Sequence, residues 1–363
     1  MKKYVLFIII LISLSCGREP SYKIIGTITD VNTIDIKLLK YSDGEFHQID
    51  SVRTSNGEFT FTGKVKNPDR FHIQLNDEPG YNGFFLENSI IEFNIDIESP
   101  TPFSVNGSIT HELYEQFEEK FQSDYSRSID SIKNLYKYIE DDIEEKILDS
   151  LLNSKIEESI NFVIDFSRIH PKSVVAPYLA YRYSYKIPEF DYNDLLAVKN
   201  NIYSQVFSSA SYKIFEKRVK KLGISAIGKP SIDFLMNDTL GNPISLLSIN
   251  SEYILIDFWG SICTPCRKQH PNLRKVYNKY KPKGFEILGV SLDDNRKDWI
   301  NAINKDKINW LQVSSLTGWN NEAVDIYNIA FVPQNVLIDG KRRIIAKNLN
   351  PRELEIYLGE IFE

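Results

Sequence analysis

Apolar residues are most densely grouped in the C-terminal third of the chain. The segment "YILIDFW", residues 253–259, is an almost unbroken apolar run, which is typical of a strand buried on both faces. After a short polar stretch, apolar residues recur with the i, i+3, i+4, i+7 spacing of one helix face, at Leu273, Val276, Tyr277 and Tyr280. The pattern predicts a buried strand that leads directly into an amphipathic helix.

Before residue 110 the apolar segments are shorter and are separated by turn residues. Five of them have the character of strands, which predicts an all-β module: "YKIIGTI", "DIKLLKY", "EFTFTGKV", "RFHIQL" and "IIEFNIDI". Phe84 and Phe85 could form a binding surface there, although core packing is the commoner fate of such residues. From 111 to 222, apolar residues spaced on a charged background predict helices. Interruptions near 170 and 187–201 disfavour one long rod, while a coiled-coil dimer stays open.

The chain begins with two lysines and an apolar run over residues 4–12. A membrane-spanning helix needs about 20 apolar residues, so this run predicts a cleaved secretory signal over residues 1–15. The signal ends at Cys16 and resembles the lipobox of bacterial lipoproteins, in which that cysteine receives a diacylglycerol. Ser13 stands where the lipobox usually has Leu. We expect an exported protein of the cell envelope or periplasm, anchored to a membrane through lipidated Cys16, with plain secretion as the alternative.

Composition and charge narrow the class of partner. Hydrophobic residues make up 42% of the chain and charged residues 25%, which fits a soluble globular protein. The net charge is -6 and no long basic block is present, so a nucleic-acid partner is not expected. Proteins or small molecules remain as partners.

Two of the three cysteines, Cys263 and Cys266, stand three positions apart between the predicted strand and helix. A disulfide over so short a loop is a poor structural staple, because the stabilisation grows with loop length. Zinc would have only His270 as a nearby third ligand, and the other histidines show no paired ligand spacing. We therefore interpret the pair as a redox dithiol, and we expect no metal and no cofactor.

The position of the pair assigns a role to each thiol. Cys263 stands at the helix N-terminus, where unpaired N–H groups and the helix dipole stabilise a thiolate. We therefore expect Cys263 to be the nucleophile. Cys266 follows one turn later on the same side of the helix but deeper, within reach of a mixed disulfide formed on Cys263. We expect it to be the resolving thiol.

Residues 228 to 363 resemble the thioredoxin-like domain of TlpA/ResA-type thiol-disulfide oxidoreductases. Six features carry the resemblance in order: "GKPSIDF", "DTLGNPISL", "LIDFWGSICTPC", Pro271, "GFEILGVSLDD" and "NIAFVPQNVLIDG". The segment "DSVRTSNGEFTFTGKVKNP" resembles an uncharacterised domain often fused to such enzymes. The expected fold class is a multidomain α+β protein, with an N-terminal β-rich domain (16–110), a helical connector (111–226) and a thioredoxin-like α/β domain (227–363).

The resemblance also implies roles for residues around the dithiol. It makes Pro333 a cis-proline that faces the dithiol, and it makes the backbone at Val332 the partner of the substrate chain. Asp257 matches the buried acid that takes a proton from the deeper thiol. Trp259, Thr264 and Pro265 join Val332 as residues expected to contact substrate. The alternatives are an ordinary trans turn at Pro333 and a structural acid at Asp257.

Two positions depart from the family pattern. Ile262 replaces the usual Trp directly before the first cysteine, so the surface around the nucleophile is altered. Gln269 stands where many members have Glu, and an amide cannot accept the proton. If a side chain relays the proton, Asp257 is the remaining candidate.

The predicted function is the reduction of disulfides in exported partner proteins, with re-reduction by an upstream electron-donor thiol protein. An oxidase would use the same residues, so the direction stays open. A redox-sensing or ligand-binding lipoprotein is the first alternative. A thiol peroxidase is disfavoured, because its PxxxTxxC pattern would need Pro and Thr where the chain has Ile256 and Gly260.

Overall fold

The computed structural model describes residues 21–42, 44–76, 78, 82–98, 104–139 and 141–362. The predicted signal and Cys16 lie outside the described residues. The chain folds into two compact units. The first contains the described residues through Lys155 together with His170–Ala176 and Tyr203–Lys213. The second contains Ile156–Ile169, Pro177–Ile202 and the chain from Ile214 onward.

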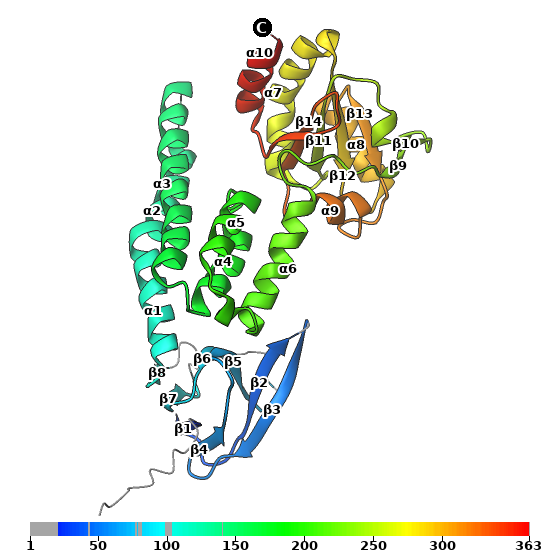
Figure 1. Ribbon diagram of the computed structural model, residues 1–363. Helices are drawn as coiled ribbons and strands as arrows, with labels where there is room; N and C mark the ends of the chain where they lie inside the picture. The colour runs from blue at the N-terminus through cyan, green and yellow to red at the C-terminus, as the bar shows by residue number, and fades with distance from the viewer. Residues whose placement is uncertain are drawn as a thin grey trace, which may run out of the picture. The chain divides into compact units, whose positions relative to one another are not determined.

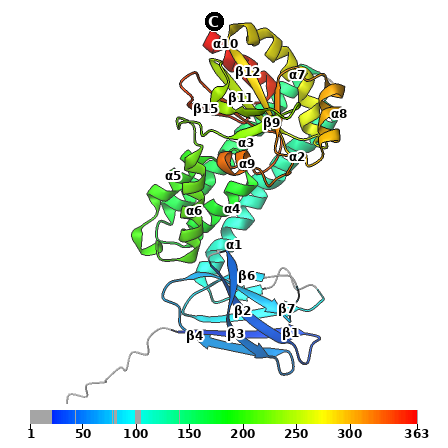
Figure 2. The same cartoon turned by 90° about the vertical axis from the view of Figure 1, so that its right-hand side faces the viewer.

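The N-terminal strands of the first unit form a β-sandwich (Figure 2). Its strands are β1 (Tyr22–Thr29), β2 (Asp35–Ser42), β3 (Glu45–Arg53), β4 (Glu58–Gly63), β5 (Asp69–Leu75), β6 (Asn82–Leu86), β7 (Ile90–Asp96) and β8 (Ser104–Asn106). In the described residues they form two four-stranded sheets, ordered β4-β1-β7-β8 and β3-β2-β5-β6. Apolar side chains of both sheets pack into one core. Phe84 and Phe85 are fully buried, which confirms core packing as their main role.

The middle of the chain is helical, as predicted. Its helices are α1 (Ile109–Phe121), α2 (Arg127–Leu135), α3 (Asp142–Ile169), α4 (Val175–Lys186), α5 (Tyr192–Asn201) and α6 (Ala210–Ile224), with a π-helical segment (Gln122–Ser126) between α1 and α2. Within the part of the chain that the structure describes, no helix is both long and apolar enough to cross a membrane.

The C-terminal part of the second unit is an α/β domain built on a seven-stranded sheet (Figure 1). Its strands are β9 (Leu235–Asp238), β10 (Pro243–Ser245), β11 (Tyr253–Trp259), β12 (Phe285–Ser291), β13 (Leu311–Ser314), β14 (Gln334–Ile338) and β15 (Ile344–Lys347). Its helices are α7 (Thr264–Tyr280), α8 (Arg296–Asp306), α9 (Glu322–Tyr327) and α10 (Pro351–Phe362). The strand order is β10-β9-β13-β12-β11-β14-β15.

Strand β11 lies within this sheet and positions the site. It pairs in parallel with β12 and antiparallel with β14. Apolar clusters cover both faces of the sheet; one includes residues of α9, and the other includes residues of α7 and α10. Six of the seven β11 residues are buried, which confirms the strand predicted from the apolar run. The expected fold class is thereby confirmed.

Candidate active site

The chain passes from β11 into α7 through a short turn that contains the first cysteine. Cys263 is the N-cap residue of α7, and its Sγ accepts a hydrogen bond from the Cys266 backbone N–H at 3.2 Å. The helix begins at Thr264, and Pro265 stands in its first turn, where the missing N–H of proline costs no helical hydrogen bond. Both residues between the cysteines are therefore helical, and both are exposed.

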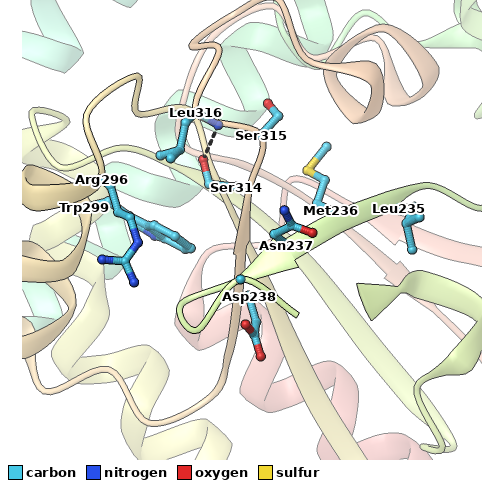
Figure 3. A pocket seen from close by; sticks show the side chains of 10 residues that line it. Leu235, Met236, Asn237, Asp238, Arg296, Trp299, Ser314, Ser315 and Leu316 are labelled. Carbon is cyan, nitrogen blue, oxygen red and sulfur yellow. Dashed lines mark hydrogen bonds between the residues drawn. The ribbon is translucent and has the colours of Figure 1, made fainter. Parts of the chain in front are cut away.

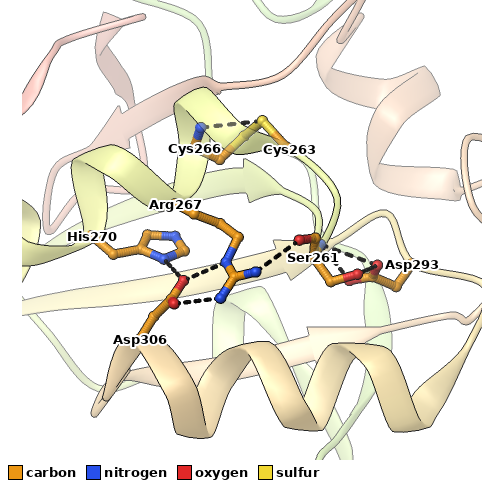
Figure 4. Close-up of a disulfide and its surroundings, with 7 residues drawn as sticks. All are labelled: Ser261, Cys263, Cys266, Arg267, His270, Asp293 and Asp306. Atoms are coloured by element: carbon orange, nitrogen blue, oxygen red, sulfur yellow. Dashed lines mark hydrogen bonds and ion pairs between the residues drawn. A yellow bond between two sulfur atoms is a disulfide. The ribbon is translucent and has the colours of Figure 1, made fainter.

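The two cysteines are joined in a disulfide (Figure 4). Their surroundings differ. Cys266 is 2% exposed and belongs to an apolar cluster with Trp259, Trp299 and Ala302. Cys263 is only partly buried and packs against the outside of that cluster. Cys263 is therefore the member of the pair whose sulfur atom can be reached from solvent.

The segment before β14 reaches the same cluster. Val332 packs against it, and the Val332–Pro333 peptide bond is cis. The Trp259 indole is fully buried, and its Nε1–H donates to Gln312 Oε1 at 2.9 Å. The fold therefore brings Trp259 and Val332 together at the dithiol, although they are far apart in the sequence.

Asp257 lies on β11, two residues before Trp259. Its side chain is buried, and the loss of hydration raises the pKa of the carboxyl group to about 7. A carboxyl group whose pKa lies near neutrality can both accept and release a proton at physiological pH.

A polar network beside the disulfide was not predicted from the sequence (Figure 4). Arg267, directly after Cys266, donates to both carboxylate oxygens of Asp306 at the end of α8. His270 Nδ1 lies 2.8 Å from Asp306 Oδ2. Arg267 also donates to the Ser261 carbonyl oxygen at 3.3 Å. Charge and hydrogen bonds thus join the first turns of α7 to α8.

The charged groups of this network shift one another's pKa values. The Arg267 guanidinium lowers the pKa of Asp306, while burial lowers the pKa of His270 against the opposing effect of the nearby carboxylate. Asp293 holds the turn before Cys263, because its carboxylate accepts from the Ser261 N–H and hydroxyl group. The "GVSLDD" segment includes Asp293, but its contact with Ser261 depends on tertiary structure.

A hollow of about 380 Å³ lies between β9, the start of α8 and the segment after β13 (Figure 3). Trp299 lines it and belongs to the apolar cluster of Cys266, and Leu316 lines it and packs against that cluster. Leu316 has a φ of 55°, a left-handed conformation that is unusual for a bulky residue. The hollow therefore adjoins the packing around the dithiol.

In the described ranges, no group of three or more His, Cys, Asp or Glu side chains is arranged to hold a metal ion. His270, the residue weighed as a zinc ligand, instead directs Nδ1 to Asp306. The chemistry that this arrangement offers is thiol–disulfide exchange.

Two family models match the chain. Residues 250–344 match the family described as thioredoxin-like, and residues 22–114 match a domain of unknown function (DUF4369). The second match agrees with the resemblance noted for the N-terminal module and gives that module no activity.

Relatives of the C-terminal domain are similar to it over most of their length. The chain is similar to the thioredoxin domain of a thiol-disulfide oxidoreductase from Bacteroides vulgatus, at 36% identity over 38% of this chain and 99% of that one, with a TM-score of 0.36. It is similar to the C-terminal domain of a putative thiol-disulfide oxidoreductase from Bacteroides thetaiotaomicron, at 33% identity over 38% and 97% of the two chains, with a TM-score of 0.37. It is also 29% identical to thiol-disulfide oxidoreductase ResA of Bacillus cereus over 138 residues, which are 37% of this chain and 78% of ResA. The sequence identities, and not the TM-scores, establish the relationship.

Proposed function

This chain belongs to the thioredoxin-like thiol-disulfide oxidoreductases, and on that premise we propose that it reduces disulfide bonds of partner proteins outside the cytoplasm. The observation that carries the proposal is the inequality of the two sulfur atoms. Cys263 caps α7 and is partly exposed, whereas Cys266 is buried in the apolar cluster. Cys263 can therefore react with a partner first, and Cys266 is close enough to react with the mixed disulfide afterwards.

The reaction consists of two exchanges that start from the reduced pair. The Cys263 thiolate attacks one sulfur of the partner's disulfide, forms a mixed disulfide and expels the partner's other sulfur as a thiolate. Cys266 then loses its proton and attacks Cys263 Sγ, which forms the Cys263–Cys266 disulfide and releases the partner's second thiolate. Two electrons pass to the partner, and a donor thiol protein must return them to the pair.

In this mechanism Asp257 accepts the proton that Cys266 loses. The pKa of Asp257 is raised to about 7 by burial, so near neutral pH a large fraction of the carboxyl group is ionised and can accept a proton. Gln269, at the other position considered, carries an amide and cannot serve as the base.

The surface around Cys263 forms the docking site for the partner in this proposal. The backbone at Val332 pairs with the partner chain beside cis-Pro333, and Thr264 and Pro265 contact it from the start of α7. Trp259 supports this surface from below, since its indole is fully buried. Ile262, 94% exposed directly before Cys263, adds an apolar contact that the sequence had not assigned.

The cellular location is proposed from the sequence. The short apolar run and Cys16 support export and lipid anchoring in the cell envelope or periplasm. The protein would then meet its partners at a membrane surface, with the dithiol carried on the C-terminal domain.

Insulin reduction tests the proposed activity. With dithiothreitol as the electron source, the full chain is expected to accelerate insulin reduction, and Cys263→Ser should lower the rate to that of dithiothreitol alone. Equilibration with redox buffers tests the direction, because a reductase should have a potential below about −200 mV. A wild-type chain that adds nothing to the rate of dithiothreitol would contradict the proposal.

A further inference from the structure

We propose that Arg218 of the helical region is a positioning residue for the dithiol site. Through Asn328 it fixes the segment that leads to Val332 and Pro333, and it thereby sets how efficiently a polypeptide disulfide is accepted. The inference rests on the proposed function, because it concerns the docking of the same partner.

Contacts with helix α4 hold the Arg218 side chain. It lies on α6, and its side chain is buried at 6% exposure. Its Nε donates to Ser184 Oγ at 3.1 Å, and its Nη2 donates to the Ser184 carbonyl oxygen at 3.0 Å. The guanidinium carbon lies 4.0 Å from the centre of the Tyr185 ring, a cation–π contact. Helix α4 therefore fixes the guanidinium in one orientation.

The guanidinium of Arg218 points at the side chain of Asn328. Arg218 Nη1 donates to Asn328 Oδ1 at 2.9 Å. Asn328 ends α9 in the left-handed conformation, with a φ of 54°, and its N–H donates to the carbonyl oxygens of the last helical turn. A planar guanidinium that is buried and held by two hydrogen bonds on one side is a rigid donor on the other.

A short connection leads from Asn328 to the dithiol. Residues 329–331 separate Asn328 from Val332, which packs against the cluster of Cys266. Near its other end the connection is held by Gln334, whose Oε1 accepts from the N–H groups of Ala330 and Phe331. The segment from Asn328 to Gln334 is therefore fixed by Gln334 on one side and by Arg218 on the other.

Other contacts hold α9 at the same junction. Ser225, one residue past α6, donates from its hydroxyl group to the Tyr327 carbonyl oxygen at 3.2 Å. Lys347 Nζ lies 3.3 Å from the Ser225 carbonyl oxygen and 3.4 Å from that of Tyr327. These contacts fix the C-terminal end of α9 at Tyr327. Arg218 instead binds Asn328, the residue with which the segment to Val332 begins.

This arrangement predicts a separation between two kinds of substrate. A polypeptide must both meet Cys263 and pair with the backbone at Val332. A small aromatic disulfide such as 5,5′-dithiobis(2-nitrobenzoate) needs only the Cys263 sulfur. Loss of the link between Arg218 and Asn328 should therefore impair turnover of the polypeptide and spare turnover of the small disulfide.

The test uses the full chain and a pair of variants at one position. Asn328→Gly removes the acceptor but keeps the left-handed backbone accessible, while Asn328→Asp keeps an acceptor oxygen. For insulin, Asn328→Gly should lower kcat/KM about tenfold, and Asn328→Asp should stay near wild type. The rate with the small disulfide should stay within about twofold for both.

Arg218→Met removes the donor from the other side and should give the same pattern as Asn328→Gly. Lys220→Met, at an exposed position on the same helix, is the matched control and should act like wild type. Thermal unfolding followed by tryptophan fluorescence shows whether each variant is folded at the assay temperature.

Three outcomes would overturn the inference. Equal losses with insulin and with the small disulfide would indicate damage to the whole site and not to polypeptide docking. Normal insulin reduction by a folded Asn328→Gly would show that the link is dispensable. A wild-type chain that reduces the small disulfide but not insulin would contradict the proposed function itself, and the inference would fall with it.

Discussion

Arg267 and Asp306 form a bidentate ion pair, with Nη2 2.6 Å from Oδ1 and Nε 2.9 Å from Oδ2. The pair joins the residue after Cys266 to the last residue of α8. His270 Nδ1, 2.8 Å from the same Oδ2, adds a second link from α7. The helix that carries Cys266 is thus fixed by a carboxylate far away in the sequence.

Asp306→Asn should destabilise the C-terminal domain by about 1–3 kcal/mol, because the half-buried Arg267 loses its counter-charge. All four tryptophans lie in residues 227–363, so fluorescence during urea unfolding reports on this domain. Asp294→Asn, at an exposed position, is the control and should change stability by less than about 0.5 kcal/mol. Similar losses in the two variants would contradict a specific role for the ion pair.

Asp257→Asn should stabilise the oxidised protein at alkaline pH. Burial raises the pKa of the native carboxyl group to about 7, above the 3.8 of an exposed aspartate, so the native state binds more protons than the unfolded state in this range. The contribution of Asp257 to the free energy of unfolding therefore falls as pH rises from 4 to 7, and this loss is complete above 7. The variant lacks this penalty and should be more stable by about 2–4 kcal/mol at pH 8, with little difference at pH 4. Urea unfolding at both pH values checks this, and an equal difference at both would refute it.

The same substitution tests the proton transfer. Asp257→Asn should slow the attack of Cys266 on the mixed disulfide about tenfold or more near neutral pH, while the first attack by Cys263 stays unchanged. Stopped-flow measurements with a fluorescent disulfide substrate separate the two steps. If both steps keep their wild-type rates, Asp257 is a structural residue.

Cys16→Ser should move the protein from the membrane fraction to the soluble fraction. The reason is that the apolar run over residues 4–12 is too short to span a membrane, so anchoring depends on the lipid at Cys16. Fractionation of cells that express each form gives the answer. Membrane association that persists in the variant would exclude the lipid anchor.

The parts of the fold that were predicted correctly have a one-sided or continuous apolar pattern. Strand β11 is buried along almost its whole length, so its apolar run was unambiguous. Strand β3 was missed because most of its residues are exposed and its sequence, "EFHQIDSVR", lacks an apolar face. Strand β6, "NGFFL", is short and begins with residues that favour turns.

The site could be predicted where its residues are neighbours in the sequence. Cys263 and Cys266 are separated by one helical turn, so the deeper position of Cys266 could be expected from local geometry. Arg267 and Asp306 are 39 positions apart, and Arg218 and Asn328 are 110 apart. Such contacts form only when the helices pack against each other. No periodic pattern in the local sequence indicates them.

In the proposed mechanism Cys263 attacks the partner and Cys266 releases it. Trapping of the mixed disulfide shows which of the two sulfur atoms attacks. Cys266→Ser removes the resolving thiol at nearly constant volume, so covalent adducts with partner proteins should accumulate and should disappear with dithiothreitol. Cys263→Ser is the matched control and should form none, because Cys266 is 2% exposed. Non-reducing gels and mass spectrometry detect and identify the adducts. Adducts with Cys266→Ser alone are the predicted result; adducts with Cys263→Ser alone would reverse the two roles, and adducts with neither would contradict the reductase mechanism.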